Sequence, residues 1–527
     1  MSALRRWWLD VVGVLAAVTY ALPSLGYRFG MDQPLHWYIG RRWLDGEMPY
    51  VSGVSTKPPG AFFVHSLSIL VFGDHQGAVR AVDLLFVLAA GALIATFRAR
   101  RRKEDGTIVA RHPRRPGEIG AACLAVGALA YTFFDWFALG HPDLWQGVFM
   151  LAAAWVVVRA PDGIVGWRRA LAAGAVACVA VSFKHVAFVS GVAFGVVVVG
   201  AAITSRRWRD AAQDGLAYTA GVALVLGVVL LPFVVTGTFD VFWEVMVEFI
   251  LAYAESEIGR VASPHNWPTW EVGLAPMLLA LGTLLGGLAL RLRDRVWSDV
   301  LVGSSVLLVM LCGLLSIGLQ DRMQNGSFAY HWLALVPALG LGLAWGLRQV
   351  APRRGGVQLA VIAGLTLLAL VAEPLWTTNP GHSYVAEWDT YLDVARGEVP
   401  EADRWRAYER ADAPLDSYIR HQRVANRISA VARPGDTLCL DGYFGVIYQL
   451  TSMRCTSRFI TPPYVMYAAL PRWGSEYMRM WEVDPPTFFV TFSDRPQVFG
   501  PIEERGYELV HVLDGQEPHY VILERIR

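Results

Sequence analysis

Long apolar runs separated by short polar segments make up the first 376 residues, and a more polar stretch follows them. A helix needs about 20 apolar residues to cross a bilayer. Eleven runs are read as spans, at 8–26, 77–98, 118–138, 144–159, 170–183, 185–203, 214–235, 273–290, 300–318, 329–347 and 357–376. We therefore expect a polytopic α-helical membrane protein with about 11 transmembrane helices. The first run is expected to be a membrane span rather than a cleaved signal peptide, because no small-residue cleavage site follows Ser24 and further apolar runs come after it.

Three further apolar stretches are expected to lie along the membrane surface rather than to cross it. Pro59–Phe72 is too short to span, and counting it as a span would move the basic cluster 98–115 to the outer face. Leu35–Leu44 mixes aromatic and basic residues, which is typical of an interfacial helix. Phe239–Ala254 is apolar but is interrupted by two glutamates. We expect residues 27–76 to form one large outer loop that carries interfacial helices.

Basic residues set the expected orientation. With the N-terminus inside and the spans alternating, the cytoplasmic ends collect 22 of the 30 basic residues in 1–376, although the outer loops are longer. This asymmetry follows the positive-inside rule. An odd number of spans then places residues 377–527 outside. We expect a multi-pass protein of the cell (inner) membrane, with a cytoplasmic N-terminus and an extracytoplasmic C-terminal domain.

Composition divides the chain at the same place. Over 527 residues, 54% are apolar and 17% are charged. Charged residues make up about 14% of 1–376 but about 25% of 377–527, which is usual for a soluble domain. We therefore expect a membrane module over 1–376 and a soluble domain over 377–527. The net charge of +1 argues against nucleic acid as a partner.

The C-terminal part is expected to be a small α/β or α+β domain. Residues 384–431 have a helical pattern. Short strands are expected at Thr437–Leu440, Thr487–Thr491, Leu509–Leu513 and Tyr520–Leu523. Cys439 and Cys455 lie in this part and could pair if it faces an oxidising compartment. The five cysteines show no metal-binding spacing.

Two aspartates are the candidate catalytic acids. Asp32 follows the first expected span and Asp143 follows the third, so the topology places both at the outer face. Two carboxylates at the boundary between the membrane and water can share the roles in a displacement reaction. One accepts a proton from the attacking hydroxyl, and the other orients that hydroxyl. The alternative is that both are helix-end caps exposed to lipid headgroups.

Lysine is rare, with three residues against 43 arginines. Lys57 precedes two prolines at the start of a short apolar helix, where the ammonium and the helix N-terminus would suit a phosphate. Lys184 lies at the expected outer turn between spans five and six. An ionisable residue close to the membrane is a functional candidate, although simple snorkelling to the interface is the alternative.

Several motifs follow one another in a characteristic order. The first outer loop contains Asp32, Tyr38, Gly46-Glu47-Met48-Pro49-Tyr50, Lys57-Pro58-Pro59, Phe72-Gly73 and Arg80, and Asp143, Lys184 and Tyr330-His331 follow. The tail contains Arg433-Pro434-Gly435-Asp436, Ile447-Tyr448-Gln449-Leu450, Ser457-Arg458-Phe459 and Asp484-Pro485-Pro486. Together these motifs resemble those of GT-C-fold glycosyltransferases that use polyprenyl-phosphate sugars. This group includes the protein O-mannosyltransferases and the aminoarabinose transferases that modify lipid A.

The resemblance implies a hexosyl- or pentosyltransferase that moves a sugar from a polyprenyl phosphate to a hydroxyl of a glycan, lipid or protein acceptor at the outer face, with inversion. Lys57 and Lys184 would hold the donor phosphate, and Asp32 and Asp143 would be catalytic. The residues that would contact donor or acceptor are Tyr330, His331 and His141. No cofactor and no metal are implied.

This chain departs from the family pattern in two places. Gln33 stands where the family often has Glu, and His141-Pro142-Asp143 stands where it often has Glu in the second loop. A polyprenyl-linked lipid flippase or transporter is the alternative function, since eleven spans would suit it. Transporters, however, tend to place polar residues at the midplane with an internal repeat, whereas the notable charges here gather at one outer face. A receptor domain on a membrane anchor would not explain eleven spans.

Overall fold

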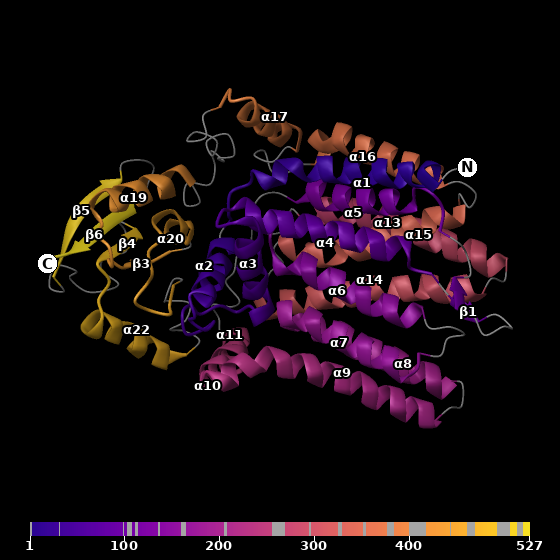
Figure 1. Ribbon diagram of the computed structural model, residues 1–527, viewed down its shortest axis with the longest axis horizontal. Helices are drawn as coiled ribbons and strands as arrows, with labels where there is room; N and C mark the ends of the chain where they lie inside the picture. Colours follow the sequence, from indigo (N-terminus) through magenta and orange to yellow (C-terminus); the bar gives the residue numbers. More distant parts are fainter. Residues whose placement is uncertain are drawn as a thin grey trace.

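The computed structural model describes most of the chain. The described residues are 3–30, 32–98, 100–102, 108–110, 114–134, 138–159, 165–204, 208–255, 269–294, 297–324, 329–350, 355–376, 384–399, 418–442, 444–460, 470–492, 506–513 and 520–526. Long helices run side by side through the larger part of the molecule, and a small sheet with helices lies at one end (Figure 1). The N-terminus lies at the opposite end of the bundle from the sheet.

A described helix coincides with each of the eleven apolar runs. These helices are α1 (Ala3–Leu25), α4 (Gly77–Ala95), α5 (Glu118–Phe133), α6 (Pro142–Val158), α7 (Trp167–Phe183), α8 (Phe188–Thr204), α9 (Trp208–Val235), α13 (Thr269–Arg293), α14 (Trp297–Gln324), α15 (Val336–Val350) and α16 (Gly355–Trp376). A short 3₁₀ turn, η2 (His185–Ala187), joins α7 to α8, and another, η4 (Ala329–Leu335), precedes α15.

Five helical segments among the described residues are long and apolar enough to cross a membrane. They lie in α1, α4, α9 and α14 and across η4 and α15. Other helices of the bundle, such as α5, α6, α8 and α16, are apolar but shorter. The bundle is thus that of a membrane protein, while the number of eleven spans stays a prediction.

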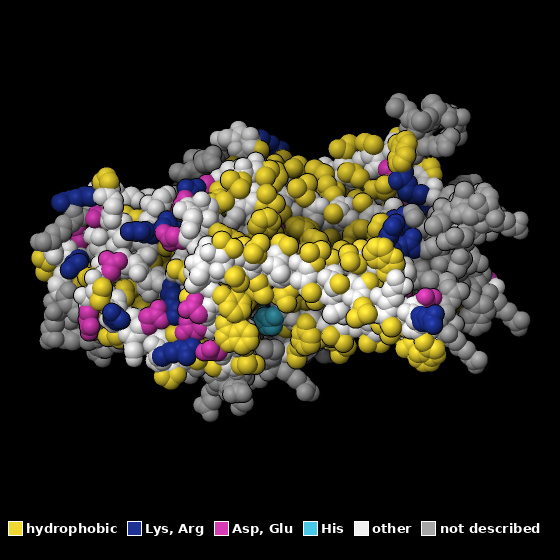
Figure 2. All heavy atoms as spheres, turned by 60° about the horizontal axis from the view of Figure 1, so that its bottom comes forward, with side chains coloured by type: hydrophobic (Ala, Val, Ile, Leu, Met, Phe, Trp, Pro, Cys, Tyr) yellow, Lys and Arg dark blue, Asp and Glu magenta, His cyan; other side chains and the backbone are white. Residues whose placement is uncertain are grey.

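The outer surface of the bundle is apolar where lipid would cover it. Helix α9 exposes Leu216, Leu231 and Val235 to more than half of their full extent. Figure 2 shows hydrophobic side chains spread over the middle of this face, with charged side chains gathered toward the two ends. Such a surface would be unstable in water, because large exposed apolar patches mark association or membrane contact.

The expected surface helices are also present as helices. They are α2 (Gln33–Leu44), α3 (Pro59–Phe72) and the segment formed by α10 (Phe239–Trp243), the π-helical turn η3 (Glu244–Phe249) and α11 (Ile250–Glu255). Helices α2 and α3 lie between the bundle and the C-terminal part (Figure 1). Two strands that the sequence did not predict, β1 (Arg100–Arg102) and β2 (Ile108–Ala110), form an antiparallel pair at the other end, within the basic cluster 98–115.

The C-terminal part contains a four-stranded mixed sheet. Its elements are α17 (Tyr384–Ala395), α19 (Tyr418–Val431), β3 (Leu438–Leu440), α20 (Val446–Thr451), α22 (Pro471–Val483), β4 (Phe488–Phe492), β5 (Tyr507–Leu513) and β6 (Tyr520–Arg525). The strand order is β3-β4-β6-β5, with β3 parallel to β4 and the other pairs antiparallel. All four predicted strands are confirmed. The middle of the expected helical region, 400–417, lies outside the described residues.

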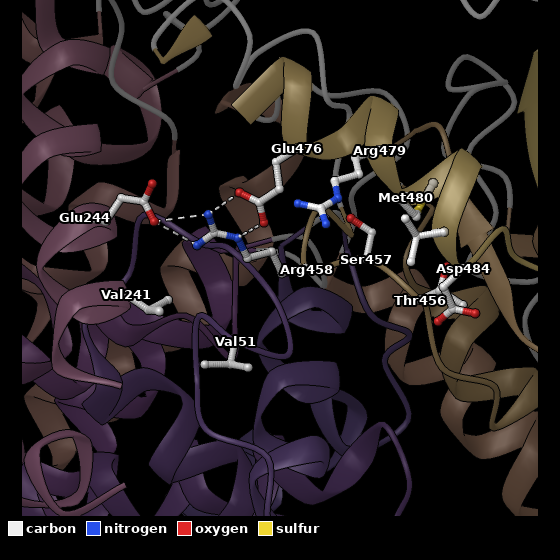
Figure 3. A pocket seen from close by; sticks show the side chains of 11 residues that line it. Val51, Val241, Glu244, Thr456, Ser457, Arg458, Glu476, Arg479, Met480 and Asp484 are labelled. Atoms are coloured by element: carbon white, nitrogen blue, oxygen red, sulfur yellow. Dashed lines mark hydrogen bonds and ion pairs between the residues drawn. The ribbon is translucent and has the colours of Figure 1, made fainter. Parts of the chain in front are cut away.

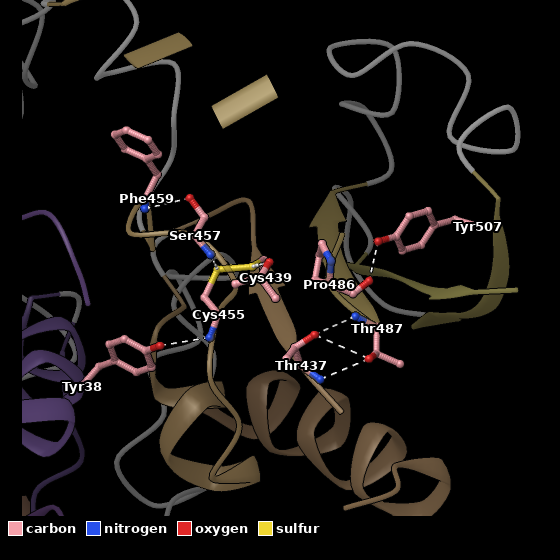
Figure 4. Close-up of a disulfide and its surroundings, with 10 residues drawn as sticks. Tyr38, Thr437, Cys439, Cys455, Ser457, Phe459, Pro486, Thr487 and Tyr507 are labelled. Atoms are coloured by element: carbon pink, nitrogen blue, oxygen red, sulfur yellow. Dashed lines mark hydrogen bonds between the residues drawn. A yellow bond between two sulfur atoms is a disulfide. The ribbon is translucent and has the colours of Figure 1, made fainter. Parts of the chain in front are cut away.

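A disulfide links β3 to the loop that docks on the membrane module. The pairing of Cys439 with Cys455, which the sequence left open, is present (Figure 4). Beside it, the backbone N–H of Cys455 donates to Tyr38 Oη of α2 over 2.9 Å, and the Tyr38 ring packs against Tyr448 of α20 with centroids 4.7 Å apart. The C-terminal part is therefore tied to the surface helix that follows Asp32.

Candidate active site

A buried ion pair joins two helix ends at the C-terminal-sheet end of the bundle. Asp143 lies in the first turn of α6, and Lys184 follows the last residue of α7. The Lys184 Nζ lies 2.5 Å from Asp143 Oδ1, and both side chains are only 2% exposed. Burial lowers the pKa of Lys184 to about 8, while the charge of Asp143 opposes this shift. Buried ion pairs are poor stabilisers compared with apolar packing, so such a pair marks a candidate functional site.

A second, more open pair lies close by. The Lys57 Nζ lies 4.0 Å from Asp32 Oδ2, and the Asp32 side chain is 28% exposed. Asp32 occupies the N-cap position of α2, but its carboxylate makes no capping hydrogen bond to that helix. The Tyr330 hydroxyl of η4 donates to Asp32 Oδ2 over 3.4 Å. This carboxylate is therefore within reach of a substrate while a lysine and a phenol hold its position.

Tyr330 connects the two pairs. The ammonium nitrogens of Lys57 and Lys184 each lie 5.6 Å from the centre of the Tyr330 ring. They are thus at most twice that distance, 11.2 Å, apart. The His141 ring stacks on Tyr330 with centroids 4.0 Å apart, and His331 meets it edge-on at 4.6 Å. We call Asp32, Lys57, Asp143, Lys184 and Tyr330 the lysine–tyrosine centre.

Two glycines allow the backbone segments of this centre to approach. A Cβ on Gly60, in the first turn of α3, would lie 2.5 Å from the carbonyl oxygen of Ser182 near the end of α7. A Cβ on Gly147 of α6 would lie 2.4 Å from the carbonyl oxygen of Ala334 in η4. Side chains at these positions would separate the segments that carry the lysines and Tyr330, because such contacts are far below van der Waals distance.

The structure brings all seven candidate residues of the sequence together, and it corrects two of the alternative interpretations. Asp143 is not an exposed helix cap, because its carboxylate is buried against Lys184. Lys184 does not snorkel to a membrane surface, because its side chain turns inward and is fully covered. Gln33 stands at a departure from the family pattern, and it has a structural role here. Its amide accepts from the Gly30 N–H and donates to the Leu139 carbonyl oxygen, which joins the two loop segments that precede the aspartates.

Sequence reasoning missed two histidines beside this centre, His36 and His65. The His36 ring of α2 lies 6.1 Å from His141 and 5.6 Å from His65 of α3. All three rings are buried, and the ring nitrogens of His65 and His141 have no hydrogen-bond partner among the described residues. Burial lowers the pKa of His36 and His141 well below the ordinary value for histidine, and the nearby charges of Lys57 and Lys184 add to the shift. Only the placement of polar residues within apolar helices hinted at them.

The centre can act on a phosphate ester. Two ammonium groups facing one region can bind an anion and stabilise it as it leaves. A carboxylate beside them can accept a proton from an attacking hydroxyl. Among the described residues, no group of three His, Cys, Asp or Glu side chains could hold a metal ion.

The chain is similar to one known protein family over part of its length and to solved structures over nearly all of it. A family model described as dolichyl-phosphate-mannose-protein mannosyltransferase matches residues 56–235. The solved structure of ArnT from Cupriavidus metallidurans bound to undecaprenyl phosphate is similar, with a TM-score of 0.58, 16% identity and coverage of 97% of both chains. The apo structure of the same protein matches with a TM-score of 0.56, again at 16% identity and 97% coverage of both chains. No curated protein sequence matches the chain.

The structural likeness establishes the fold. The structural likeness extends over nearly the whole length of both chains, and the family model covers the segment that contains Lys57, Asp143 and Lys184. The chain is therefore a membrane protein with the GT-C fold, and its resemblance to the glycosyltransferases that use polyprenyl-phosphate sugars is confirmed.

Proposed function

We propose that this protein transfers a sugar from a polyprenyl-phosphate donor to an acceptor hydroxyl at the outer membrane face, with inversion at the anomeric carbon. One observation carries the proposal: two ammonium groups lie 5.6 Å from one aromatic ring whose hydroxyl bonds the candidate base. The GT-C fold and the structure of ArnT bound to undecaprenyl phosphate support a lipid-phosphate donor.

Lys57 and Lys184 would hold the donor phosphate. A compact ammonium acts as a point charge and can approach a phosphate where a planar guanidinium would not fit. Asp143 touches Lys184 rather than open space, so its role is to keep that lysine charged and in position. This assignment moves Asp143 from a direct catalytic role to a positioning one.

Asp32 would act as the general base. The acceptor oxygen forms a bond to the anomeric carbon, its proton passes to Asp32, and the bond from that carbon to the phosphate oxygen breaks. The polyprenyl phosphate leaves as an anion between the lysines. Tyr330, His141 and His331 surround this region and would contact the sugar or the acceptor.

The proposed orientation places this chemistry outside the cell membrane and the N-terminus inside. Arg98 and Arg348, from two of the basic clusters of the sequence, both lie against Glu118 at the end of the bundle remote from the centre. A cysteine introduced at 114 should therefore resist a membrane-impermeant thiol reagent in intact cells, whereas one at 385, where Val385 is 49% exposed, should react. The opposite labelling would refute the orientation.

The test of the function is sugar transfer by the purified protein. It is incubated with radiolabelled polyprenyl-phosphate sugars, and release of the sugar from the lipid is followed. Lys57→Ala and Lys184→Ala should each lower kcat/KM by roughly tenfold to a thousandfold, and the double variant should be less than additive if both lysines bind one phosphate. Arg427→Ala, on the exposed face of α19, is the matched control for loss of a cation. Movement of the lipid across the membrane with its sugar bond intact would instead indicate a flippase.

A further inference from the structure

A cavity whose lining includes no residue of the lysine–tyrosine centre lies between the membrane module and helix α22 (Figure 3). Its volume is about 550 Å³, within the range of ligand pockets. Val51 of the first outer loop and Val241 of α10 form one side. The loop 456–458 and the residues of α22 from Glu476 onward form the other. Nothing in the proposed reaction uses this cavity.

One wall of the cavity is fixed by an ion-pair network. The Arg458 guanidinium donates to Glu244 Oε2 over 3.1 Å and to both oxygens of Glu476 over 2.7 and 2.6 Å. The indole N–H of Trp473 donates to Glu244 Oε1 over 2.7 Å. These contacts use the hydrogen-bonding groups of Arg458 and Glu244 within the protein, so the two residues shape the wall and are not offered as ligand contacts.

The loop that carries Arg458 is held from both sides. The Cys439–Cys455 disulfide anchors it to β3 (Figure 4). On the other side, the backbone N–H of Val54 donates to the Arg458 carbonyl oxygen over 2.7 Å. The cavity therefore does not depend on a ligand for its shape.

Three polar groups of the lining remain available. Within the described part of the chain, no hydrogen bond or ion pair engages the Arg479 guanidinium or the Asp484 carboxylate. The Ser457 hydroxyl oxygen accepts from the Phe459 N–H, which leaves its own proton free. A cation, an anion and a hydroxyl thus face a cavity whose opposite side carries Val51 and Val241 beside the ion-paired Glu244.

This combination fits a carbohydrate ring better than other occupants. Sugars carry hydroxyls that donate and accept at the ring edge and C–H groups on the ring faces, which match the polar and apolar sides. Charged groups of both signs would oppose an acyl chain, because burying an unpaired charge in hydrocarbon is costly. Peptides often bind by adding a strand to a sheet edge, but none of the lining residues lies on a strand.

The cavity is linked to the candidate base by the chain itself. Glu244 belongs to η3, which continues into α11. Burial raises the pKa of Tyr253 in α11, and the charge of Asp32 adds to this shift, so this helix lies within electrostatic reach of the base. Val51, on the apolar side, lies six positions before Lys57. The cavity is therefore connected to the lysine–tyrosine centre through η3–α11 and through the first outer loop.

We propose that the cavity between α10–η3 and α22 binds the carbohydrate part of the acceptor, with Arg479, Asp484 and Ser457 as its polar contacts. The proposal that this cavity binds a glycan does not depend on the proposed function. Only the identification of this glycan as the acceptor rests on it.

The binding test uses a thiol reporter in the full-length protein. Val483 lines the cavity and is 69% exposed, whereas the cysteines outside the disulfide are buried. The rate of maleimide labelling of Val483→Cys is measured with neutral trisaccharides of different configurations, with phosphorylated trisaccharides and with a serine-containing peptide of similar size, each at millimolar concentration. We expect the trisaccharides to slow labelling, and Arg479→Ala and Asp484→Asn to abolish this protection.

Matched controls are Arg427→Ala on α19 and Glu482→Gln, an exposed carboxylate on α22 that does not line the cavity. Both should keep the protection. Protection by the peptide alone, protection that survives Arg479→Ala, or no protection by any trisaccharide would overturn the proposal.

A kinetic test determines whether the glycan that binds in the cavity is the acceptor of the reaction. In Arg479→Ala the KM for the acceptor should rise about tenfold or more, as expected for the loss of a charged hydrogen bond. Release of the donor sugar to water should stay unchanged, because Arg479 lies outside the lysine–tyrosine centre. If trisaccharides protect but the acceptor KM is unaltered, the cavity is not the acceptor site. If wild-type protein releases no sugar from any lipid donor, the proposed function fails while glycan binding is judged on protection alone.

Discussion

Replacing Asp143 with asparagine is the most informative change at the lysine–tyrosine centre. The substitution keeps the size of the side chain but removes the negative charge 2.5 Å from the Lys184 ammonium. Burial lowers the pKa of Lys184 to about 8, and Asp143 provides the largest influence in the opposite direction. Without that carboxylate the pKa of Lys184 falls further, and the lysine loses its proton at a lower pH.

The magnitude follows from the size of the shift. The difference between the ordinary value of 10.5 and about 8, at about 1.4 kcal/mol for each pH unit, is about 3–4 kcal/mol. This is the free energy by which the folded protein opposes the charged lysine even with Asp143 present. Because the unfolded chain binds the proton more tightly, stability should rise with pH between about 8 and 10.5. A neutral Lys184 would forfeit about 2–4 kcal/mol of transition-state stabilisation, or roughly thirtyfold to a thousandfold in rate.

The assay is kcat/KM for sugar release from the lipid donor between about pH 6 and about pH 10. In the wild type the rate should fall as the pH rises through about 8, since Lys184 must be charged to hold the phosphate. In Asp143→Asn this fall should move to lower pH. Lys184→Met is the control, and adding Asp143→Asn to it should change the rate little, because Asp143 acts through Lys184. An unaltered pH profile in Asp143→Asn, or a full additional loss in the Lys184→Met background, would refute this reasoning.

Further predictions concern the base and the docking of the C-terminal part. Asp32→Asn should abolish transfer without lowering the Tm in detergent, because this carboxylate is partly exposed and caps no helix; near-wild-type turnover would exclude it as the base. Glu244 is half-buried, and hydrogen bonds and arginine charges hold its pKa below 4.5. The ion pairs of Glu244 should therefore stabilise the fold above pH 4.5, and this stabilisation should be lost as the pH falls through the lowered pKa. The acid-induced drop in Tm should therefore be smaller in Glu244→Gln, and an equal drop would contradict the assignment. Loss of the Cys439–Cys455 link through Cys455→Ser should cost about 3 kcal/mol by the loop-entropy relation, measured by proteolysis of the C-terminal part, while sugar release to water persists.

The sequence by itself determined the helices of the bundle and the strands of the tail. An apolar run about as long as a bilayer is thick has to form a helix in lipid, because each backbone polar group must find its partner within the segment. Pro59–Phe72 and Leu35–Leu44 could be recognised as helices of another kind, since one is too short and the other mixes aromatic with basic residues. Alternating patterns likewise identified the strands. The candidate residues could be named because motifs such as Lys57-Pro58-Pro59 occur in a characteristic order.

Only the tertiary structure decided what those residues do to one another. Lys57 and Lys184 are 127 positions apart, and their approach depends on Gly60 packing against Ser182 and on Tyr330 arriving from another helix. The sequence predicted Asp143 as a catalytic acid, whereas in the structure its carboxylate is buried and paired with Lys184.

The cavity beside α22 could be predicted from the sequence even less than the lysine–tyrosine centre could. It depends on Arg458 meeting Glu244 across 214 positions, and no local pattern records that contact. Apolar length and periodicity act within one helix or strand and can be read along the chain. The charges of a site, by contrast, interact through space, so their pKa values and roles follow from the packing of segments that are distant in sequence.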